Sequence, residues 1–142
     1  MKKNIFSSKK NESELEGILG SLEREIMETV WDRQTVSGRE VFESVKKTKN
    51  VALTTVLTVL DRLGKKGLLR KIKDNSVFVY KPVMSRQEFV EQVSSETFKR
   101  VMNISSLDAV ASFVNVVADS SPEELQRLMQ LVEKKKIEME NR

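Results

Sequence analysis

The side chains best suited to chemistry lie on one face of a helix predicted over Leu53 to Gly67. This face carries short hydroxyls followed by cations, namely Thr54, Thr55, Thr58, Arg62 and Lys65. Hydroxyls reach base edges and phosphates, and cations neutralise backbone charge, so the combination suits a helix that enters a DNA major groove by its N-terminus. An ordinary amphipathic helix with a threonine-rich face would show the same residues. The neighbouring elements must therefore decide between the two interpretations.

The other side of this helix is predicted to lie on a hydrophobic core. Its apolar residues recur at three- and four-residue spacing, and they are Leu53, Val56, Leu57, Leu60 and Leu63. Gly67 is expected to end the helix, after cations in the last turn that complement the helix dipole.

The absence of two residue types limits the functions that the chain can have. The 142 residues include no cysteine and no histidine. Without them the chain has no thiolate or imidazole metal site, no disulfide, no cysteine nucleophile and no histidine acid or base. Two S-x-x-K matches, Ser7 to Lys10 and Ser44 to Lys47, lack the S-D-N and K-T-G companions of penicillin-binding enzymes. We therefore expect no enzymatic activity, no cofactor and no metal.

Positive charge is concentrated in one part of the chain. Residues 35–83 hold eleven Lys/Arg against four Asp/Glu, a balance of +7, whereas residues 84–142 hold eight against ten, a balance of −2. The first part is therefore expected to bind a polyanion, and the second to do something else.

Two helices are predicted before the one described above. Residues 22–33 keep helical spacing of apolar side chains, with Ser21 available as N-cap and Trp31 expected in the core. A capping box formed by Ser37 and Glu40 predicts a second helix. That helix should begin at Gly38, run to about Lys47 and bury its apolar residues Val41, Phe42 and Val45.

After Gly67 the pattern changes to that of a β-hairpin. The segments LLRKIKD and VFVYKP are short, are rich in β-branched and aromatic residues, and are separated by Asp74, Asn75 and Ser76, which favour a turn. Its cations Arg70, Lys71 and Lys73 are expected to lie on phosphates. Three helices followed by a basic hairpin predict a winged helix-turn-helix domain, with the hairpin as the wing.

At this point the chain resembles a known family. The run from Leu22 to Pro82, with LEREIMETVW, SGREVFESV, TTVLTVLDRLGKKGLL and VFVYKP, is similar to the N-terminal domain of the bacterial penicillinase repressors of the BlaI/MecI type. The resemblance implies that two copies bind a palindromic operator. It also implies that the threonines and the following arginine of the third helix, Thr54, Thr55, Thr58 and Arg62, lie at the DNA.

The remaining residues predict further helices. Ser85 and Glu88 form a second capping box, and Ser121 followed by Pro122 marks another helix start. Three helices with apolar stripes in fewer than about sixty residues cannot cover their own surface, so a second copy of the chain is the expected partner. The residues assigned to this dimerisation are Phe89, Val93, Val110, Val114, Leu125, Leu128 and Met129.

The chain departs from the family in two ways that bear on regulation. It lacks the cysteine-rich tail of the copper-responsive branch, so copper sensing through thiolates is excluded. The β-lactam-responsive members are cut at an Asn-Phe bond in the dimerisation region, and the nearest equivalent here is Ser112-Phe113. This departure argues against induction by cleavage at an Asn-Phe bond, and the sequence assigns no regulatory protease or sensor.

Together these patterns predict a mainly α protein with a small β-hairpin wing. We expect a mobile arm at residues 1–20, a winged helix-turn-helix domain at 21–83 and a helical dimerisation region at 84–142. No apolar run is long enough to cross a membrane, and we expect a cytoplasmic protein. The main hypothesis is a homodimeric repressor of transcription. The alternative is a winged-helix module that binds proteins and not DNA. The charge of +7 favours DNA.

Overall fold

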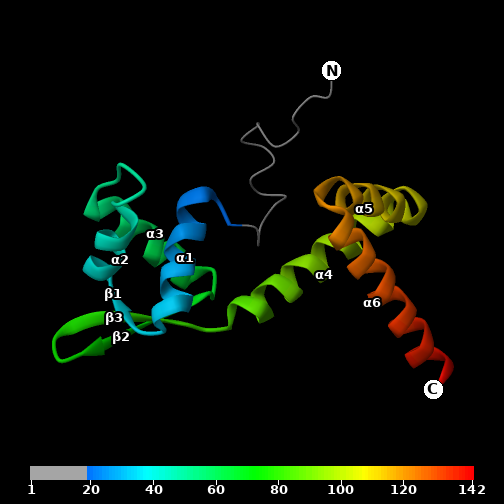
Figure 1. Cartoon of the computed structure of the whole chain (residues 1–142). Coiled ribbons are helices and arrows are strands. Elements are labelled where there is room, and N and C mark those ends of the chain that lie inside the picture. Colours follow the sequence, from blue (N-terminus) through cyan, green and yellow to red (C-terminus); the bar gives the residue numbers. More distant parts are fainter. Residues whose placement is uncertain (1–18) are drawn as a thin grey trace. The chain divides into compact units, whose positions relative to one another are not determined.

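The computed structural model describes residues 19–142, so the predicted arm lies outside the described residues except for its last two. The elements follow in the order α1 (Ser21–Arg33), β1 (Val36–Ser37), α2 (Gly38–Val45), α3 (Leu53–Lys65), β2 (Leu69–Asp74), β3 (Val77–Pro82), α4 (Arg86–Ile104), α5 (Ser106–Ser120) and α6 (Pro122–Glu140) (Figure 1). This confirms a mainly α fold with a β-hairpin wing. The contacts divide the chain between Val93 and Ser94, inside α4, into a winged-helix unit (residues 19–93) and a C-terminal unit (residues 94–142).

The sheet contains one strand that the sequence did not predict. Its order is β1-β3-β2, and the short β1 pairs with β3 through Val36 opposite Tyr80. Two residues are too few to show the alternation by which strands are recognised in a sequence. The hairpin itself was expected, and its two-residue turn holds Asn75 and Ser76 at φ 47° and 70°, as a type I′ turn requires.

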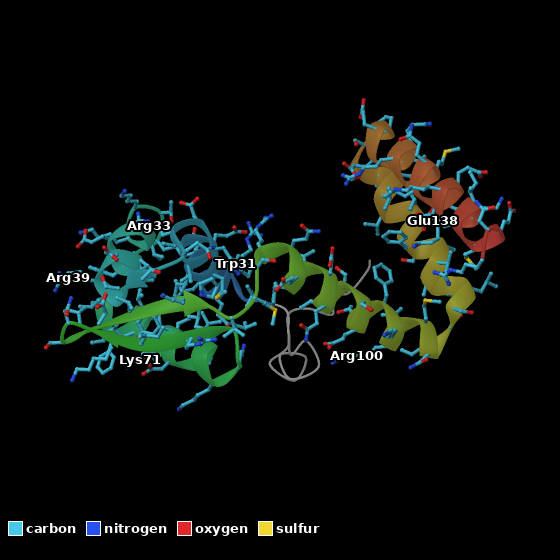
Figure 2. The ribbon with its side chains drawn as sticks, turned by 90° about the horizontal axis from the view of Figure 1, so that it is seen from below. Trp31, Arg33, Arg39, Lys71, Arg100 and Glu138 are labelled. Atoms are coloured by element: carbon cyan, nitrogen blue, oxygen red, sulfur yellow. The ribbon has the colours of Figure 1, made fainter. Side chains whose placement is uncertain are left out.

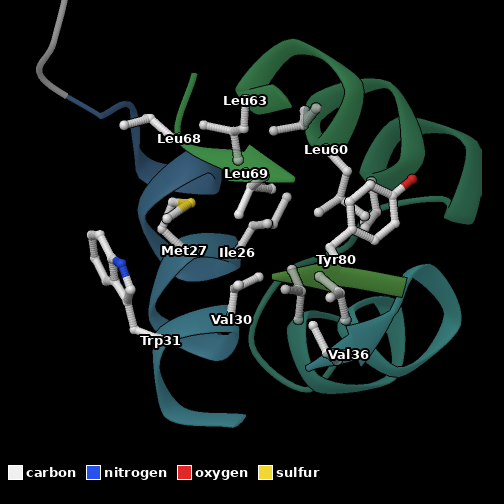
Figure 3. Packing of buried hydrophobic residues seen from close by; sticks show 14 of the residues in the cluster. Ile26, Met27, Val30, Trp31, Val36, Leu60, Leu63, Leu68, Leu69 and Tyr80 are labelled. Carbon is white, nitrogen blue, oxygen red and sulfur yellow. The ribbon is translucent and has the colours of Figure 1, made fainter. Parts of the chain in front are cut away.

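The core of the winged-helix unit lies where α1, α2 and α3 meet the sheet. The fully buried side chains are Ile26, Met27 and Val30 of α1, Val36 of β1, Val41 of α2, and Val56, Leu60 and Leu63 of α3 (Figure 3). Side chains from four elements thus share one interior, which holds α3 in place and leaves its other face outside.

The beginning of α4 also belongs to this core. Phe89 packs against Trp31 with ring centroids 5.5 Å apart, and the indole N–H of Trp31 donates to the carbonyl of Met84 at 3.1 Å. Both rings are only 9% exposed, so the core role expected for Trp31 is confirmed. Figure 3 shows Trp31 at one margin of the cluster and Tyr80 at the other.

Three of the four predicted serine caps are present. Ser37 Oγ accepts from the N–H of Glu40 at 3.2 Å, Ser85 Oγ from that of Glu88 at 3.1 Å, and Ser121 Oγ from that of Glu124 at 3.1 Å. Ser21 is different, because α1 already begins at this residue and its N-cap is Gly20.

Two boundaries and two burial predictions were wrong. Helix α2 ends at Val45 instead of about Lys47, and helix α3 ends at Lys65 instead of Gly67. On α2, Phe42 is only half-buried. On α3, Val59 is buried where the sequence predicted Leu57. The reason lies in α2, since a Cβ on Gly38 would stand only 2.5 Å from a terminal methyl of Leu57. Leu57 therefore lies over Gly38 at the edge of the core and stays exposed.

The C-terminal unit has almost no interior of its own. Ala109 is the only buried residue between Ser94 and Arg142. Helices α5 and α6 pack together, and Phe98 of α4 meets Phe113 of α5 edge to face at 4.9 Å. Among the described residues, no helix combines the length and the apolar character that a membrane span needs.

Candidate nucleic-acid interface

The outer face of α3 is the first component of the site. The residues predicted to bind DNA, Thr54, Thr55, Thr58, Arg62 and Lys65, are all exposed. The opposite side of the helix is seated on the core through Val56, Val59, Leu60 and Leu63. This face is therefore exposed to a ligand, and the helix that carries it is held in place by a packed interior.

One threonine on this face has its proton engaged. Thr58 Oγ1 donates to the backbone carbonyl of Thr54 at 2.9 Å, one helical turn back. The hydroxyl oxygen keeps its acceptor lone pairs. Thr58 can therefore accept a hydrogen bond from a base amino group and offer its methyl group to a thymine methyl.

The structure adds a residue that the sequence analysis overlooked. Asp61 lies between Thr58 and Lys65 at helical spacing, and its side chain is 56% exposed on the same side of α3. The spacing of three and four residues was visible in the sequence. Asp61 was not predicted as a site residue because a carboxylate repels a polyanion such as DNA.

The register of the hairpin divides the three predicted wing cations. Lys71 lies opposite Tyr80 and Lys73 opposite Phe78, whereas Arg70 lies opposite Lys81. Directly opposite residues share a face and successive residues alternate, so Lys71 and Lys73 point to one side of the hairpin and Arg70 to the other. Lys71 and Lys73 can therefore contact neighbouring phosphates from the same face of the hairpin. Arg70 lies on the other face, so the three cations do not form one patch.

Lys71 is already occupied within the chain. Its Nζ lies 3.7 Å from Asp61 Oδ1, 4.4 Å from the centre of the Phe78 ring and 6.0 Å from that of Tyr80. Lys73 and Arg70 have no ion pair with any residue that the structure describes. Lys71 thus links the wing to α3, whereas the charges of Lys73 and Arg70 remain available to phosphates.

A groove opens between α2, α3 and the hairpin. It has a volume of about 540 Å³, and its lining includes Leu53, Leu57, Phe78 and Tyr80 with Lys71 and Asp61. Burial raises the pKa of Tyr80, and Asp61 adds to this while Lys71 opposes it, so the phenol stays neutral. Figure 2 shows Lys71 on the hairpin and Arg39, which also lines the groove, at the margin of the winged-helix unit.

The residues assigned to dimerisation occupy three kinds of environment. Phe89 is buried in the winged-helix core, and Val93 packs against that core partly buried. Leu125 and Leu128 are half-buried, whereas Val110, Val114 and Met129 are exposed. The dipeptide Ser112-Phe113 lies in the middle of α5, not in a loop.

In the described part of the chain, no group of three or more acidic side chains is arranged to hold a metal ion. The winged-helix unit combines three helices and a hairpin with an exposed face of hydroxyls and cations on α3. These features define a winged helix-turn-helix protein of the DNA-binding class.

Comparison with known proteins identifies the family. Residues 19–134 match the penicillinase repressor family. The transcriptional regulator BlaI of Mycobacterium tuberculosis H37Rv is 36% identical over 115 residues, which cover 78% of this chain and 82% of that protein. The penicillinase repressor of Bacillus licheniformis is 30% identical over 118 residues, which cover 83% and 91%.

Solved structures were found as well. The solution structure of the Bacillus licheniformis BlaI monomeric form in complex with the blaP half-operator is 33% identical, covers 49% of this chain and 84% of that one, and has a TM-score of 0.44. The DNA-binding domain of the repressor BlaI is 34% identical, covers 48% and 83%, and has the same TM-score of 0.44.

The chain belongs to the penicillinase repressor family. It is accordingly a DNA-binding transcriptional repressor and not an enzyme.

Proposed function

We propose that this protein represses transcription by binding a palindromic operator as a homodimer. One observation carries the proposal: the hydroxyl and cationic face of α3 is exposed beside a cationic hairpin, on a unit whose core is already complete. In this arrangement α3 enters the major groove, and the wing lies along the phosphates. A repressor acts where its operator is, and the proposal assigns this protein to the cytoplasm.

The two parts of the chain differ in charge, and we assign them different functions. Residues 21–83 read DNA, and residues 84–142 join two copies. The first turns of α4 serve the winged-helix unit in addition, because Phe89 packs against Trp31 there.

Dimerisation is supported by apolar surface that the C-terminal unit leaves uncovered. Ile104 and Leu107 are 87% and 81% exposed, and Val110, Val116 and Met129 are each more than half exposed. Monomeric soluble proteins seldom leave so many apolar side chains exposed on a single short segment. A second copy covers such a surface symmetrically, which also matches the two-fold symmetry of a palindrome.

The protein-interaction alternative predicts a different surface. A docking module needs an apolar or mixed patch, whereas residues 35–83 carry a net +7. Electrostatic attraction to phosphates provides a reason for such an excess.

The proposal is tested by selection from duplex DNA with a randomised central stretch, followed by titration of the selected duplex and of unrelated DNA. We expect an enriched palindrome and two protein copies per duplex by analytical ultracentrifugation. Failure to enrich any sequence would favour the interaction module. Enrichment of a site without two-fold symmetry would leave DNA reading in place and contradict the homodimer.

A further inference from the structure

Asp61 is an acid in the middle of a surface that faces a polyanion. Thr54, Thr58, Asp61 and Lys65 follow one another along α3 at steps of four, three and four residues, and all are exposed. Asp61 is the only acidic residue of α3. A carboxylate repels phosphates and so weakens binding to DNA. Its position on this face is therefore favourable only if another group offsets its charge or donates a hydrogen bond to it.

Lys71 meets only part of that need. The Asp61–Lys71 separation is 3.7 Å, and both side chains are about half exposed. A pair of this kind contributes about 0–1 kcal/mol at most. Lys71 is also held by aromatic rings, with Phe78 at 4.4 Å, so its position does not depend on Asp61.

The carboxylate of Asp61 therefore keeps free acceptor capacity. Oδ1 faces Lys71 at more than hydrogen-bond distance, and neither oxygen accepts a hydrogen bond from any residue in the described range. A carboxylate has two oxygens and about four acceptor positions. Asp61 can thus accept hydrogen bonds from a ligand while Lys71 offsets its charge.

The major groove offers few donors to such an acceptor. Guanine presents N7 and O6 and thymine presents O4, which are all acceptors and repel a carboxylate. Adenine presents the N6 amino group beside the acceptor N7, whereas cytosine presents the N4 amino group with no acceptor beside it. Of the four bases, cytosine is the one whose edge suits Asp61 without a repulsive neighbour.

We propose that Asp61 is a specificity-determining residue that accepts a hydrogen bond from a cytosine amino group in the major groove, with Lys71 as its partial counter-charge. The inference rests on the proposed DNA-reading function. It assigns to Lys71 the neutralisation of Asp61, and it distinguishes Lys71 from Lys73, which is proposed to bind phosphates.

The experiment compares the full-length protein with Asp61→Asn and Asp61→Ala. Each protein is selected on duplexes with a randomised central stretch, and each is then titrated on the wild-type selected duplex, on duplexes changed at single base pairs and on unrelated DNA. Asp74→Asn is the matched control, because it removes an exposed carboxylate from the wing, opposite Val77 and on the other face of the hairpin from Lys71. Thermal melting establishes that all four proteins are folded.

Wild type should prefer cytosine at one position of each half-site, by about 5- to 150-fold over the other bases, which corresponds to 1–3 kcal/mol for one good base contact. Asp61→Asn should change this preference to adenine, because an amide can bond N6 and N7 together. Asp61→Ala should lose the preference and bind unrelated DNA more tightly. Asp74→Asn should keep every base preference.

Other results would overturn the inference. If Asp61→Asn and Asp61→Ala gained affinity for all DNA with unchanged preferences, Asp61 would be a general electrostatic filter. A change at a position where wild type does not select cytosine would contradict the cytosine assignment. In both cases the wild type still selects a site, so the proposed function would survive. If wild type selected no sequence, both would fail together.

Discussion

Arg62 can form two hydrogen bonds to one base, whereas Thr58 can only accept one and pack its methyl group, because its proton is donated to Thr54. A base contact favours the operator over random DNA, and a phosphate contact favours both equally. The relative losses on the two kinds of DNA therefore reveal which contact each side chain makes.

We predict that Arg62→Ala weakens operator binding by about 1–3 kcal/mol and binding to random DNA by less, and that Thr58→Ala has a smaller effect of the same kind. Fluorescence titration on the two DNAs at one salt concentration measures this. Arg127→Ala, an exposed arginine of α6, is the matched control and should leave both affinities nearly unchanged. Equal losses on operator and random DNA would make Arg62 a backbone contact.

The wing lysines allow a second prediction at this scale. Lys73→Ala should lower the slope of log affinity against log salt by about one unit, because one phosphate contact is lost. Lys71→Ala should lower it by less, since Lys71 already shares its charge with Asp61 at 3.7 Å. Titration of operator DNA over a series of salt concentrations gives both slopes. An unchanged slope for Lys73→Ala would place this face of the wing away from the DNA.

Helix α4 begins as part of the winged-helix core. Phe89, the fourth residue of the helix, packs against Trp31, and Met84, two residues before the helix begins, accepts the indole hydrogen bond. A ring that is 9% exposed within its own chain has little surface left for another copy. Phe89 should therefore affect the stability of the winged-helix unit, although the sequence assigned it to the dimer.

We predict that Phe89→Ala lowers the free energy of unfolding by about 3 kcal/mol, through lost burial and the cavity left beside Trp31. Urea unfolding followed by the fluorescence of Trp31, the single tryptophan, measures the loss. Val90→Ala is a suitable neighbour control, because Val90 is about half exposed and should cost much less. A normal unfolding midpoint together with weakened dimerisation would return Phe89 to the interface.

The elements of this fold could be predicted from the sequence wherever local chemistry determines them. The serines at 37, 85 and 121 were recognised because a cap and its helix are neighbours in the chain. Strand β1 was missed because its partner Tyr80 is distant in sequence. Leu57 was misplaced because the close approach of Gly38 to α3 depends on tertiary packing.

The candidate site followed the same rule. The exposed residues of α3 could be predicted from helical spacing on a single element. The occupation of Lys71 by Asp61, Phe78 and Tyr80 could not, because it needs the hairpin folded against α3. The burial of Phe89 likewise depends on a contact between α1 and α4.

At the scale of the molecule, the proposed homodimer raises the affinity for a palindrome because its two copies are joined, although each copy makes the same contacts to its own half-site. Once one unit is bound, the second half-site is met at an effective concentration that can reach roughly millimolar. In a two-fold dimer the recognition helices are spaced about 34–36 Å apart or a multiple of it. If the C-terminal units join the two copies as proposed, a signal that separates them releases DNA and leaves α3 intact.

Cleavage at Ser112-Phe113 is a poor way to generate such a signal in the folded protein. The bond lies within α5, and Phe113 packs against Phe98. A protease needs an extended substrate, so α5 would first have to unfold locally.

The last prediction tests the division of labour by truncation. A chain that ends at Val93 keeps Met84 and Phe89 on Trp31, whereas one that ends at Pro82 loses both and should unfold more readily. We predict that the chain ending at Val93 is folded and monomeric and binds a half-site as tightly as the intact protein does. On the full palindrome it should bind more weakly by orders of magnitude, because the second contact is no longer intramolecular. Analytical ultracentrifugation and titration on half-site and full-site duplexes measure these properties. A dimeric fragment, or one that binds the full site as tightly as the intact chain, would show that dimerisation does not depend on residues 94–142.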